Sequence, residues 1–291
     1  MQINNQQTKT AYFGNSKFSV YCLEEMKKLG LVPDLIVTTP DRPKGRKLEL
    51  TESETKAWAK ANGVAFIEQE KLRDPAFLNY LQSTIYDLYI VASYGKIIPD
   101  SILNLPKYKT INIHPSLLPK YRGPSPLQEQ ILNDDRNVGV TIMQMDKEVD
   151  HGPIIIQDKV EIPNWPPKLD ELKKITAKTG ADLLAKILPD WIAGKIVARE
   201  QNHSEATFTK KVEKTDGLID TKDGDPYQNF LKIQTYHIWP RAFFMQKTAD
   251  RDIRVVITEA NFDDGQLMIT KVIPEGKKEM SYQDFLRGIR K

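Results

Sequence analysis

The strongest indication of the fold is the run Thr110-Ile-Asn-Ile-His-Pro-Ser-Leu-Leu-Pro-Lys-Tyr-Arg-Gly123. Asn112 and His114 lie two residues apart, so on an extended segment both side chains project to one face. Pro115 disfavours a helical conformation for the residue before it. We therefore expect a strand over Thr110–His114 that runs out into a loop, which is where an open α/β sheet builds its sites.

Predicted strands and helices alternate on both sides of this stretch. We expect strands over residues 10–14, Asp34–Thr39, Asp87–Ser93 and Gly139–Met145. Helical patterns lie between them, and a long helix is predicted over Leu169–Leu188, ended by Pro189. The alternation predicts an α/β fold with a doubly wound, Rossmann-like parallel sheet. The first strand ends at Phe13-Gly14-Asn15-Ser16, without the G-x-G-x-x-G of a dinucleotide-binding loop.

The pattern changes after residue 200. A short polar linker at Gln201–Glu205 separates residues 1–200 from residues 206–291. Short β runs follow, with the turn signal Asp263-Asp264-Gly265 and one predicted helix over Pro226–Thr235; the runs are Thr207–Thr209, Phe243–Gln246, Arg254–Glu259 and Gln266–Val272. Short strands around one helix predict a small C-terminal β-barrel of the oligonucleotide-binding (OB) type.

Composition narrows the class of protein. The chain has 291 residues with 42 basic and 39 acidic side chains, so its net charge of +3 permits a nucleic-acid partner without arguing for one. No apolar run approaches the roughly 20 residues of a membrane span. The single cysteine, Cys22, suits a reducing cytoplasm, and we expect it to be a core residue. Four histidines without ligand spacing indicate no metal site. We expect a cytoplasmic monomer.

Three polar residues are candidates for catalysis. Asp150, in Val149-Asp-His-Gly-Pro153, follows the predicted strand Gly139–Met145 and joins Asn112 and His114. An aspartate held against a histidine favours the charged imidazole. The amide and the imidazole could then stabilise an oxyanion as a nucleophile adds to a carbonyl. No serine or cysteine lies in a nucleophile motif, so covalent catalysis is not suggested.

The run Pro40-Asp-Arg-Pro-Lys-Gly-Arg-Lys47 carries two prolines, one glycine and four basic residues. Most runs of this kind are solvated surface loops. The alternative is a basic arm that contacts phosphates, where charge supplies affinity without choosing a sequence.

Several motifs, in order, resemble the signatures of the folate-dependent formyltransferases. They are Asn112-Ile-His114, Ser116-Leu-Leu-Pro119, Tyr121-Arg-Gly123 and Asp150-His-Gly152. The run Gly139-Val-Thr-Ile-Met-Gln-Met-Asp146 resembles the methionyl-tRNA branch in particular. The resemblance extends from about Ala11 to Arg287 and is therefore far more specific than any one motif.

The resemblance implies transfer of the formyl group of 10-formyltetrahydrofolate to the α-amine of methionine on initiator tRNA. Asn112 and His114 would stabilise the oxyanion, and Asp150 would hold His114 in its charged form and take protons through a water. The folate-binding residues that it implies are Val91, Tyr94, Gly95, Ser116, Leu117, Leu118 and Pro119. The tRNA-binding residues that it implies are Arg42, Lys44, Arg46, Lys47 and Arg122.

Other functions stay open on the sequence. The wording around Pro115 and Gly152 is also similar to the glycinamide ribonucleotide branch, which lacks a second domain of this kind. Sugar-nucleotide N-formyltransferases share the catalytic trio and can carry extra C-terminal domains. A folate- or tRNA-binding relative without catalysis is the non-enzyme alternative. His151 is unusual for the tRNA branch, and the last domain looks shortened.

Overall fold

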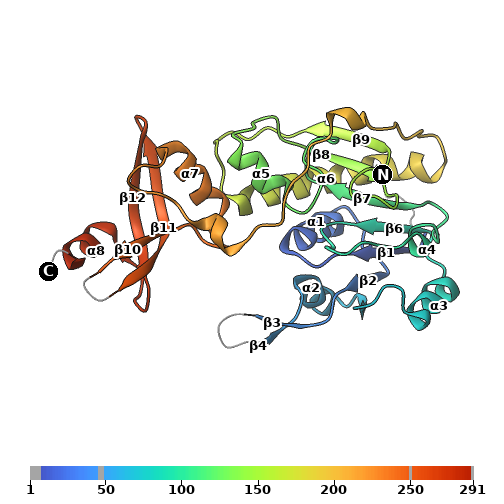
Figure 1. Cartoon of the computed structure of the whole chain (residues 1–291). Helices are drawn as coiled ribbons and strands as arrows, with labels where there is room; N and C mark the ends of the chain where they lie inside the picture. Colours follow the sequence, from blue (N-terminus) through green and yellow to red (C-terminus); the bar gives the residue numbers. More distant parts are fainter. Residues whose placement is uncertain (1–7, 45–48, 249–250, 290–291) are drawn as a thin grey trace. The chain divides into compact units, whose positions relative to one another are not determined.

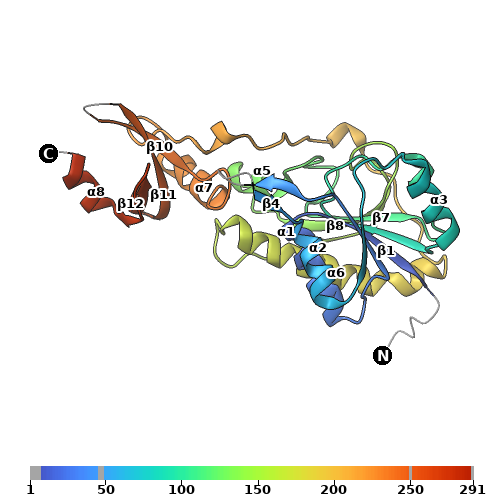
Figure 2. The same cartoon turned by 90° about the horizontal axis from the view of Figure 1, so that it is seen from below.

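The structure of the protein is a computed structural model that describes residues 8–44, 49–248 and 251–289. The chain forms two compact units (Figures 1 and 2). Unit 1 comprises residues 1–126, 137–161 and 173–209, and unit 2 comprises residues 127–136, 162–172 and 210–291. Each unit is built from several chain segments, so the two are not consecutive along the sequence.

A seven-stranded sheet forms the centre of unit 1. Its strands are β1 (Thr10–Phe13), β2 (Leu35–Thr38), β5 (Ala65–Glu68), β6 (Leu88–Val91), β7 (Thr110–His114), β8 (Gly139–Gln144) and β9 (Ile154–Lys159), in the order β5-β2-β1-β6-β7-β8-β9. The first five are parallel, which confirms the predicted α/β fold. The sheet is mixed, because β8 and β9, at one side of it, pair antiparallel. The connection between them is too short for the crossover that a parallel pair needs.

Helices cover both faces of this sheet, as a doubly wound fold requires. They are α1 (Lys17–Lys28), α2 (Glu54–Asn62), α3 (Pro75–Thr84), α4 (Asp100–Leu103) and α6 (Leu169–Ile192). Phe77 of α3 and Ile102 of α4 belong to one buried cluster with Phe13 and Val91 of the sheet. On the other face, the Tyr12 hydroxyl donates to the Ser19 carbonyl of α1 at 2.9 Å.

The long helix does not end where the sequence predicts. Pro189 lies inside α6, which continues to Ile192. A proline removes one backbone donor but leaves later turns free to form. Buried Leu184 and Leu188 supply packing that outweighs the lost hydrogen bond.

Strand register decides which side chains of β7 share a face. Val91 of β6 pairs with Asn112, and Ile90 pairs with Ile111. Because paired residues in neighbouring strands project to the same side, Asn112 and His114 lie on the face of α3 and α4. Ile113 projects to the other face, where α6 crosses β7 at Gly180: a Cβ at Gly180 would lie 2.5 Å from Cγ2 of Ile113.

A four-stranded antiparallel sheet forms most of unit 2. Its strands are β10 (Phe243–Lys247), β11 (Asp252–Asp263), β12 (Gln266–Pro274) and β13 (Met280–Ser281), in sequence order. Helices α7 (Pro226–Thr235) and α8 (Tyr282–Ile289) contribute Ile233 and Phe285 to its core. Asp264 and Gly265 have φ of +46° and +75°, so the predicted turn is a two-residue hairpin of type I′.

The predicted C-terminal β unit is therefore present, but its sheet is open among the described residues, with β10 and β13 at opposite edges. Thr207–Thr209 was expected to be a strand and forms only an isolated bridge, between Phe208 and Arg122. The remaining elements are α5 (Pro126–Leu132), the hairpin strands β3 (Arg42–Lys44) and β4 (Glu49–Thr51), and the 3-10 turns His203–Glu205 and Lys214–Gly217.

We predict that Gly180→Ala destabilises the protein, although alanine favours a helix by about 1 kcal/mol. The new methyl group would overlap the buried, β-branched Ile113, and overpacking of this kind costs about 1–3 kcal/mol. The free energy of unfolding should fall by about 1 kcal/mol in a denaturant titration. Gly288→Ala in α8 is the control, because nothing lies within 4 Å of its added Cβ. Equal effects of the two substitutions would contradict a tight crossing of α6 over β7.

Candidate active site

Three polar side chains converge at the carboxyl end of β7. Asn112 and His114 are 7% and 4% exposed. The Asn112 amide donates to Asp150 Oδ1 at 3.3 Å, and His114 Nδ1 lies 3.5 Å from the same oxygen. The trio that the sequence singled out, from segments almost 40 residues apart, thus meets at one carboxylate.

The loop after β8 delivers Asp150 in a strained conformation. Its φ is +48°, a left-handed geometry that costs an ordinary residue about 1–3 kcal/mol. The backbone N–H of Gly123 donates to Asp150 Oδ2 at 2.7 Å, so both carboxylate oxygens have partners. Gly152 holds the loop against β8, because any Cβ there would lie 2.0 Å from the Gln144 carbonyl oxygen. The surroundings, rather than the residue itself, therefore fix the carboxylate.

The backbone also orients the His114 ring. Nε2 lies 3.0 Å from the Tyr121 carbonyl oxygen, and a carbonyl only accepts, so Nε2 carries a proton. Nδ1 faces Asp150 and, when it is protonated, is the nitrogen that can donate to a reacting group. Donors from an amide and an imidazole beside a carboxylate can stabilise a developing oxyanion and move a proton.

The loop Ser116–Pro119 continues directly from His114. Ser116 is fully buried, and its hydroxyl donates to the Lys120 carbonyl at 2.7 Å. The Thr141 hydroxyl of β8 donates to the Ser116 carbonyl at 2.6 Å, and the Gln157 amide of β9 donates to the Leu118 carbonyl at 2.7 Å. Leu117 packs against Gly139, where a Cβ would lie 2.3 Å from its side chain. The predicted folate-binding loop is thus tied to the two antiparallel strands.

The other predicted folate-binding residues follow the neighbouring strand. Val91 ends β6 opposite Asn112, so both groups lie at the same edge of the sheet. The Tyr94 side chain belongs to the core, edge-on to Phe13 with ring centroids 5.5 Å apart, which leaves its backbone as the part able to meet a ligand. Gly95 has a φ of +76°, a turn that favours glycine.

Asn15 is a residue at these strand ends that sequence reasoning missed. Its side-chain oxygen accepts from the Thr38 hydroxyl at 2.7 Å and from the Thr39 N–H at 2.8 Å. Its amide donates to the Tyr94 carbonyl. Asn15 therefore links the ends of β1, β2 and β6. Its place in the Gly14-Asn-Ser16 loop after the first strand was the signal that could have found it.

Arg122 is buried and does not lie on an exposed surface, where a tRNA-binding residue is expected. The sequence makes it a tRNA-binding candidate, but its side chain is 3% exposed. Its guanidinium donates to Gln201 Oε1 at 2.7 Å and contacts His203 Nδ1 at 2.8 Å. Burial lowers the pKa of Arg122, and the negative charge of Asp150 opposes that shift. An arginine so enclosed is not presented to a phosphate backbone.

The unusual His151 packs beside the trio instead of joining it. Its ring stacks on that of His203, with centroids 4.0 Å apart and an interplanar angle of 2°. Its Nδ1 lies 2.7 Å from Asp146 Oδ2, while Asp146 Oδ1 accepts from the Glu148 N–H at 2.9 Å. Asp146 thus forms a turn, and His151 braces the loop that carries Asp150.

The basic run forms the start of a hairpin rather than a plain loop. Arg42 opens β3, is exposed, and pairs with Glu70 at 3.3 Å. Lys44 ends the same strand, and Arg46 and Lys47 lie outside the described residues. Surface pairs of this kind contribute little stability, so an incoming phosphate can compete for Arg42.

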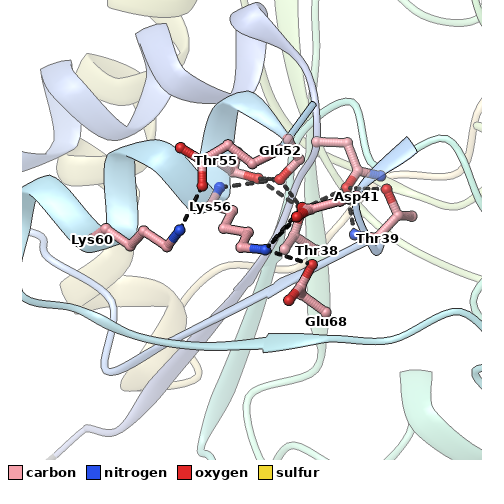
Figure 3. A network of polar contacts seen from close by, with 10 residues as sticks. Thr38, Thr39, Asp41, Glu52, Thr55, Lys56, Lys60 and Glu68 are labelled. Atoms are coloured by element: carbon pink, nitrogen blue, oxygen red, sulfur yellow. Dashed lines mark hydrogen bonds and ion pairs between the residues drawn. The ribbon is translucent and has the colours of Figure 1, made fainter. Parts of the chain in front are cut away.

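A buried lysine anchors the base of this hairpin (Figure 3). Lys56 of α2 donates from Nζ to both oxygens of Asp41, at 2.8 and 2.9 Å, and to Glu68 Oε1 at 2.9 Å. Asp41 directly precedes Arg42, so Lys56 ties the hairpin to the ends of α2 and β5. Hydrogen bonds to Asp41 and Glu68 raise the pKa of Lys56, and the bond from Lys56 lowers the pKa of Asp41.

Residues 8–44, 49–248 and 251–289 contain no group of three or more histidine, cysteine, aspartate or glutamate side chains able to hold a metal ion. No helix there has the length and apolar character to cross a membrane.

Several known proteins are similar in sequence to this chain. The sequence profile of the family described as Formyl transferase matches residues 8–188. The chain belongs to the formyl transferase family. The methionyl-tRNA formyltransferase of Halalkalibacterium halodurans is 34% identical, over 96% of this chain and 94% of that protein. The one from Chloroflexus aggregans is 38% identical, over 80% of this chain and 74% of that protein. These relatives confirm the family that the sequence motifs resemble.

A solved structure has a similar fold over most of the chain. HypX from Aquifex aeolicus, in complex with tetrahydrofolic acid, aligns with a TM-score of 0.67 at 15% identity. The alignment covers 97% of this chain and 47% of that one. At this identity the likeness concerns the fold alone.

We predict that Lys56→Met loosens the β3–β4 hairpin. Asp41 stabilises the network above the ordinary pKa of an aspartate, about 4, and this contribution is lost as pH falls through its lowered pKa. Lys56 contributes below the ordinary lysine pKa, about 10.5, and this is lost as pH rises through its raised pKa. Hydrogen exchange of Arg42–Lys44 and Glu49–Thr51 should therefore be faster in the variant at pH 7. The difference from the parent protein should shrink as the pH falls through the lowered pKa of Asp41.

The control for this prediction is Lys60→Met, one turn further along α2. Lys60 pairs with Glu52 at 2.6 Å, but their side chains are 51% and 37% exposed, against 10% for that of Lys56. A hairpin that exchanges at the same rate in the Lys56 and Lys60 variants would contradict an anchoring role for Lys56.

Proposed function

We propose that this protein transfers the formyl group of 10-formyltetrahydrofolate to the α-amine of methionine carried on initiator tRNA, for the start of translation. One observation carries the proposal: Asn112, His114 and Asp150 converge within a chain that is alignable, almost end to end, with a protein named methionyl-tRNA formyltransferase. We further propose that it acts as a monomer in the cytoplasm.

The donor would lie at the carboxyl ends of β6 and β7. The loop Ser116–Pro119 and the backbone from Val91 to Gly95 border this edge of the sheet. Backbone N–H and C=O groups held in fixed positions suit a flat ring with several hydrogen-bonding atoms, such as a pterin. HypX, which has a similar fold, was solved in complex with tetrahydrofolic acid, and this agrees with a folate donor.

The reaction we propose is direct attack of the neutral amine on the formyl carbon. A C–N bond forms, and the formyl oxygen becomes an oxyanion beside Asn112 and His114, which donate to it. The proton lost by the amine passes to Asp150, directly or through a water. The oxyanion then re-forms a carbonyl as the bond from carbon to N10 of the folate breaks, and N10 takes the proton that Asp150 received. No covalent bond to the protein is needed.

The basic hairpin is the proposed contact to tRNA. Arg42 is exposed on β3, and the anchor at Lys56 gives the hairpin a defined base. Lys44, Arg46 and Lys47 are proposed to act with it, and Arg122 is not, because its guanidinium is buried against Gln201. A sugar-nucleotide acceptor remains the alternative, since the trio alone does not choose the amine.

The test is formyl transfer by the purified protein with three acceptors: methionyl initiator tRNA, glycinamide ribonucleotide and an amino-sugar nucleotide. Transfer to the tRNA alone is expected. His114→Ala should lower kcat by about 10²–10⁴-fold while the protein still binds folate. Transfer only to a small acceptor would overturn the tRNA assignment. If the parent protein binds folate but transfers no formyl group to any acceptor, the result would favour a folate-binding protein over an enzyme.

We predict that Arg42→Gln weakens tRNA use in a salt-dependent way. Loss of one phosphate contact should raise KM for the tRNA, leave kcat unchanged, and reduce the slope of log affinity against log salt by about one. Kinetics at several salt concentrations measure this. The control is Lys178→Gln, another exposed, ion-paired cation, on α6. Unchanged tRNA kinetics in the Arg42 variant would mean that the hairpin does not contact the tRNA.

A further inference from the structure

The side chain of Gln201 lies directly behind the Asp150 loop. Gln201 is the first residue of the segment that the sequence marks as a polar linker, yet it is only 5% exposed. Its Nε2 donates to the Asp150 carbonyl at 2.9 Å and to the Gly152 carbonyl at 2.7 Å. One amide group therefore holds the backbone on both sides of His151.

The other end of the same amide is also fixed. Gln201 Oε1 accepts from Arg122 Nε at 3.2 Å and from Arg122 Nη2 at 2.7 Å. Arginine only donates and carbonyls only accept, so this network admits one orientation of the Gln201 amide. All of its hydrogen-bonding groups face buried partners, which is the arrangement that a rigid connector requires.

The segment around Gln201 is bound to the active-site loops at several points. The Arg122 N–H donates to the Thr207 carbonyl at 2.9 Å, and the Thr209 N–H donates to the Arg122 carbonyl at 2.7 Å. Arg199 and Ile154 exchange two backbone hydrogen bonds of 2.7 Å. Gly123, whose N–H holds the Asp150 carboxylate, is therefore part of the same assembly as Gln201.

We infer that Gln201 is a positioning residue for Asp150: it holds the loop backbone so that the carboxylate stays against Asn112 and His114. Asp150 needs such support, because its left-handed φ of +48° is unfavourable without it. Arg122 serves this purpose from behind, which gives a role to a buried arginine that no phosphate reaches. The inference rests on the proposed function for its kinetic consequences, but not for its structural ones.

Gln201→Glu tests the contact with little change of shape. A glutamate keeps both acceptor contacts to Arg122, but it cannot donate to the two carbonyl oxygens. We expect kcat to fall by about 10–100-fold, the loss that a misplacement of about 1 Å can cause, while the KM values for folate and tRNA change less than threefold. The melting temperature should change no more than it does in the control variant Gln157→Glu.

A double-mutant cycle separates positioning from a general structural effect. If Gln201 acts through Asp150, then adding Gln201→Glu to Asp150→Ala should reduce the residual activity no further. The control is Gln157→Glu, because the Gln157 amide likewise bridges to a loop carbonyl, that of Leu118. Its effect should be additive with Asp150→Ala. Equal losses from Gln201→Glu with and without Asp150 would overturn the inference.

A second measurement does not depend on the reaction. Hydrogen exchange of peptides covering 146–152 should be faster in Gln201→Glu than in the parent protein, and unchanged exchange would overturn the inference even in a protein that transfers no formyl group. An inactive parent protein would by itself count against the proposed function only. Should Gln201→Glu not fold, Gln201→Asn replaces it, because the shortened amide cannot reach both carbonyls at once.

Discussion

The site depends on the contacts that the Asp150 carboxylate makes with its neighbours. The carboxylate receives the Asn112 amide and the His114 imidazole at one oxygen and the Gly123 N–H at the other. Those three partners come from a strand end and from the loop that follows it, so the carboxylate ties the carboxyl edge of β7 to the β8–β9 connection. A negative charge at this depth is tolerable because each oxygen has a donor.

The sheet makes that meeting possible. Parallel pairing of β6 with β7 sets Val91 opposite Asn112. Because β8 pairs antiparallel with β7, it ends beside Ile111, and the loop that follows carries Asp150 to Asn112 and His114. Gly180 and Gly152 are the close approaches that permit it, one beneath β7 and one against the end of β8. A side chain added at either glycine would have to displace the neighbouring atoms, because packed interiors leave no free space.

Two networks of charged and polar side chains hold two different loops in place. Lys56, Asp41 and Glu68 form the first, in which one lysine pairs with two carboxylates at the base of the basic hairpin. Arg122 and Gln201 form the second network, which orients the backbone of the Asp150 loop more than it stabilises the fold. A buried ionic group is weak support for stability on its own, but it can specify one arrangement of its neighbours.

The sequence by itself determined the alternation of strands and helices, the β7 strand with its two same-face polar residues, and the Asp264-Gly265 hairpin, because these follow from local periodicity and turn chemistry. It also supplied the trio, through motifs in order. Tertiary structure alone decided the antiparallel edge strands, the continuation of α6 past Pro189, and the burial of Arg122 and Gln201. Charge and polarity predict exposure only on average, whereas a buried polar residue depends on partners up to about 80 residues away, here Gln201 and Arg122. No local pattern encodes such a partner.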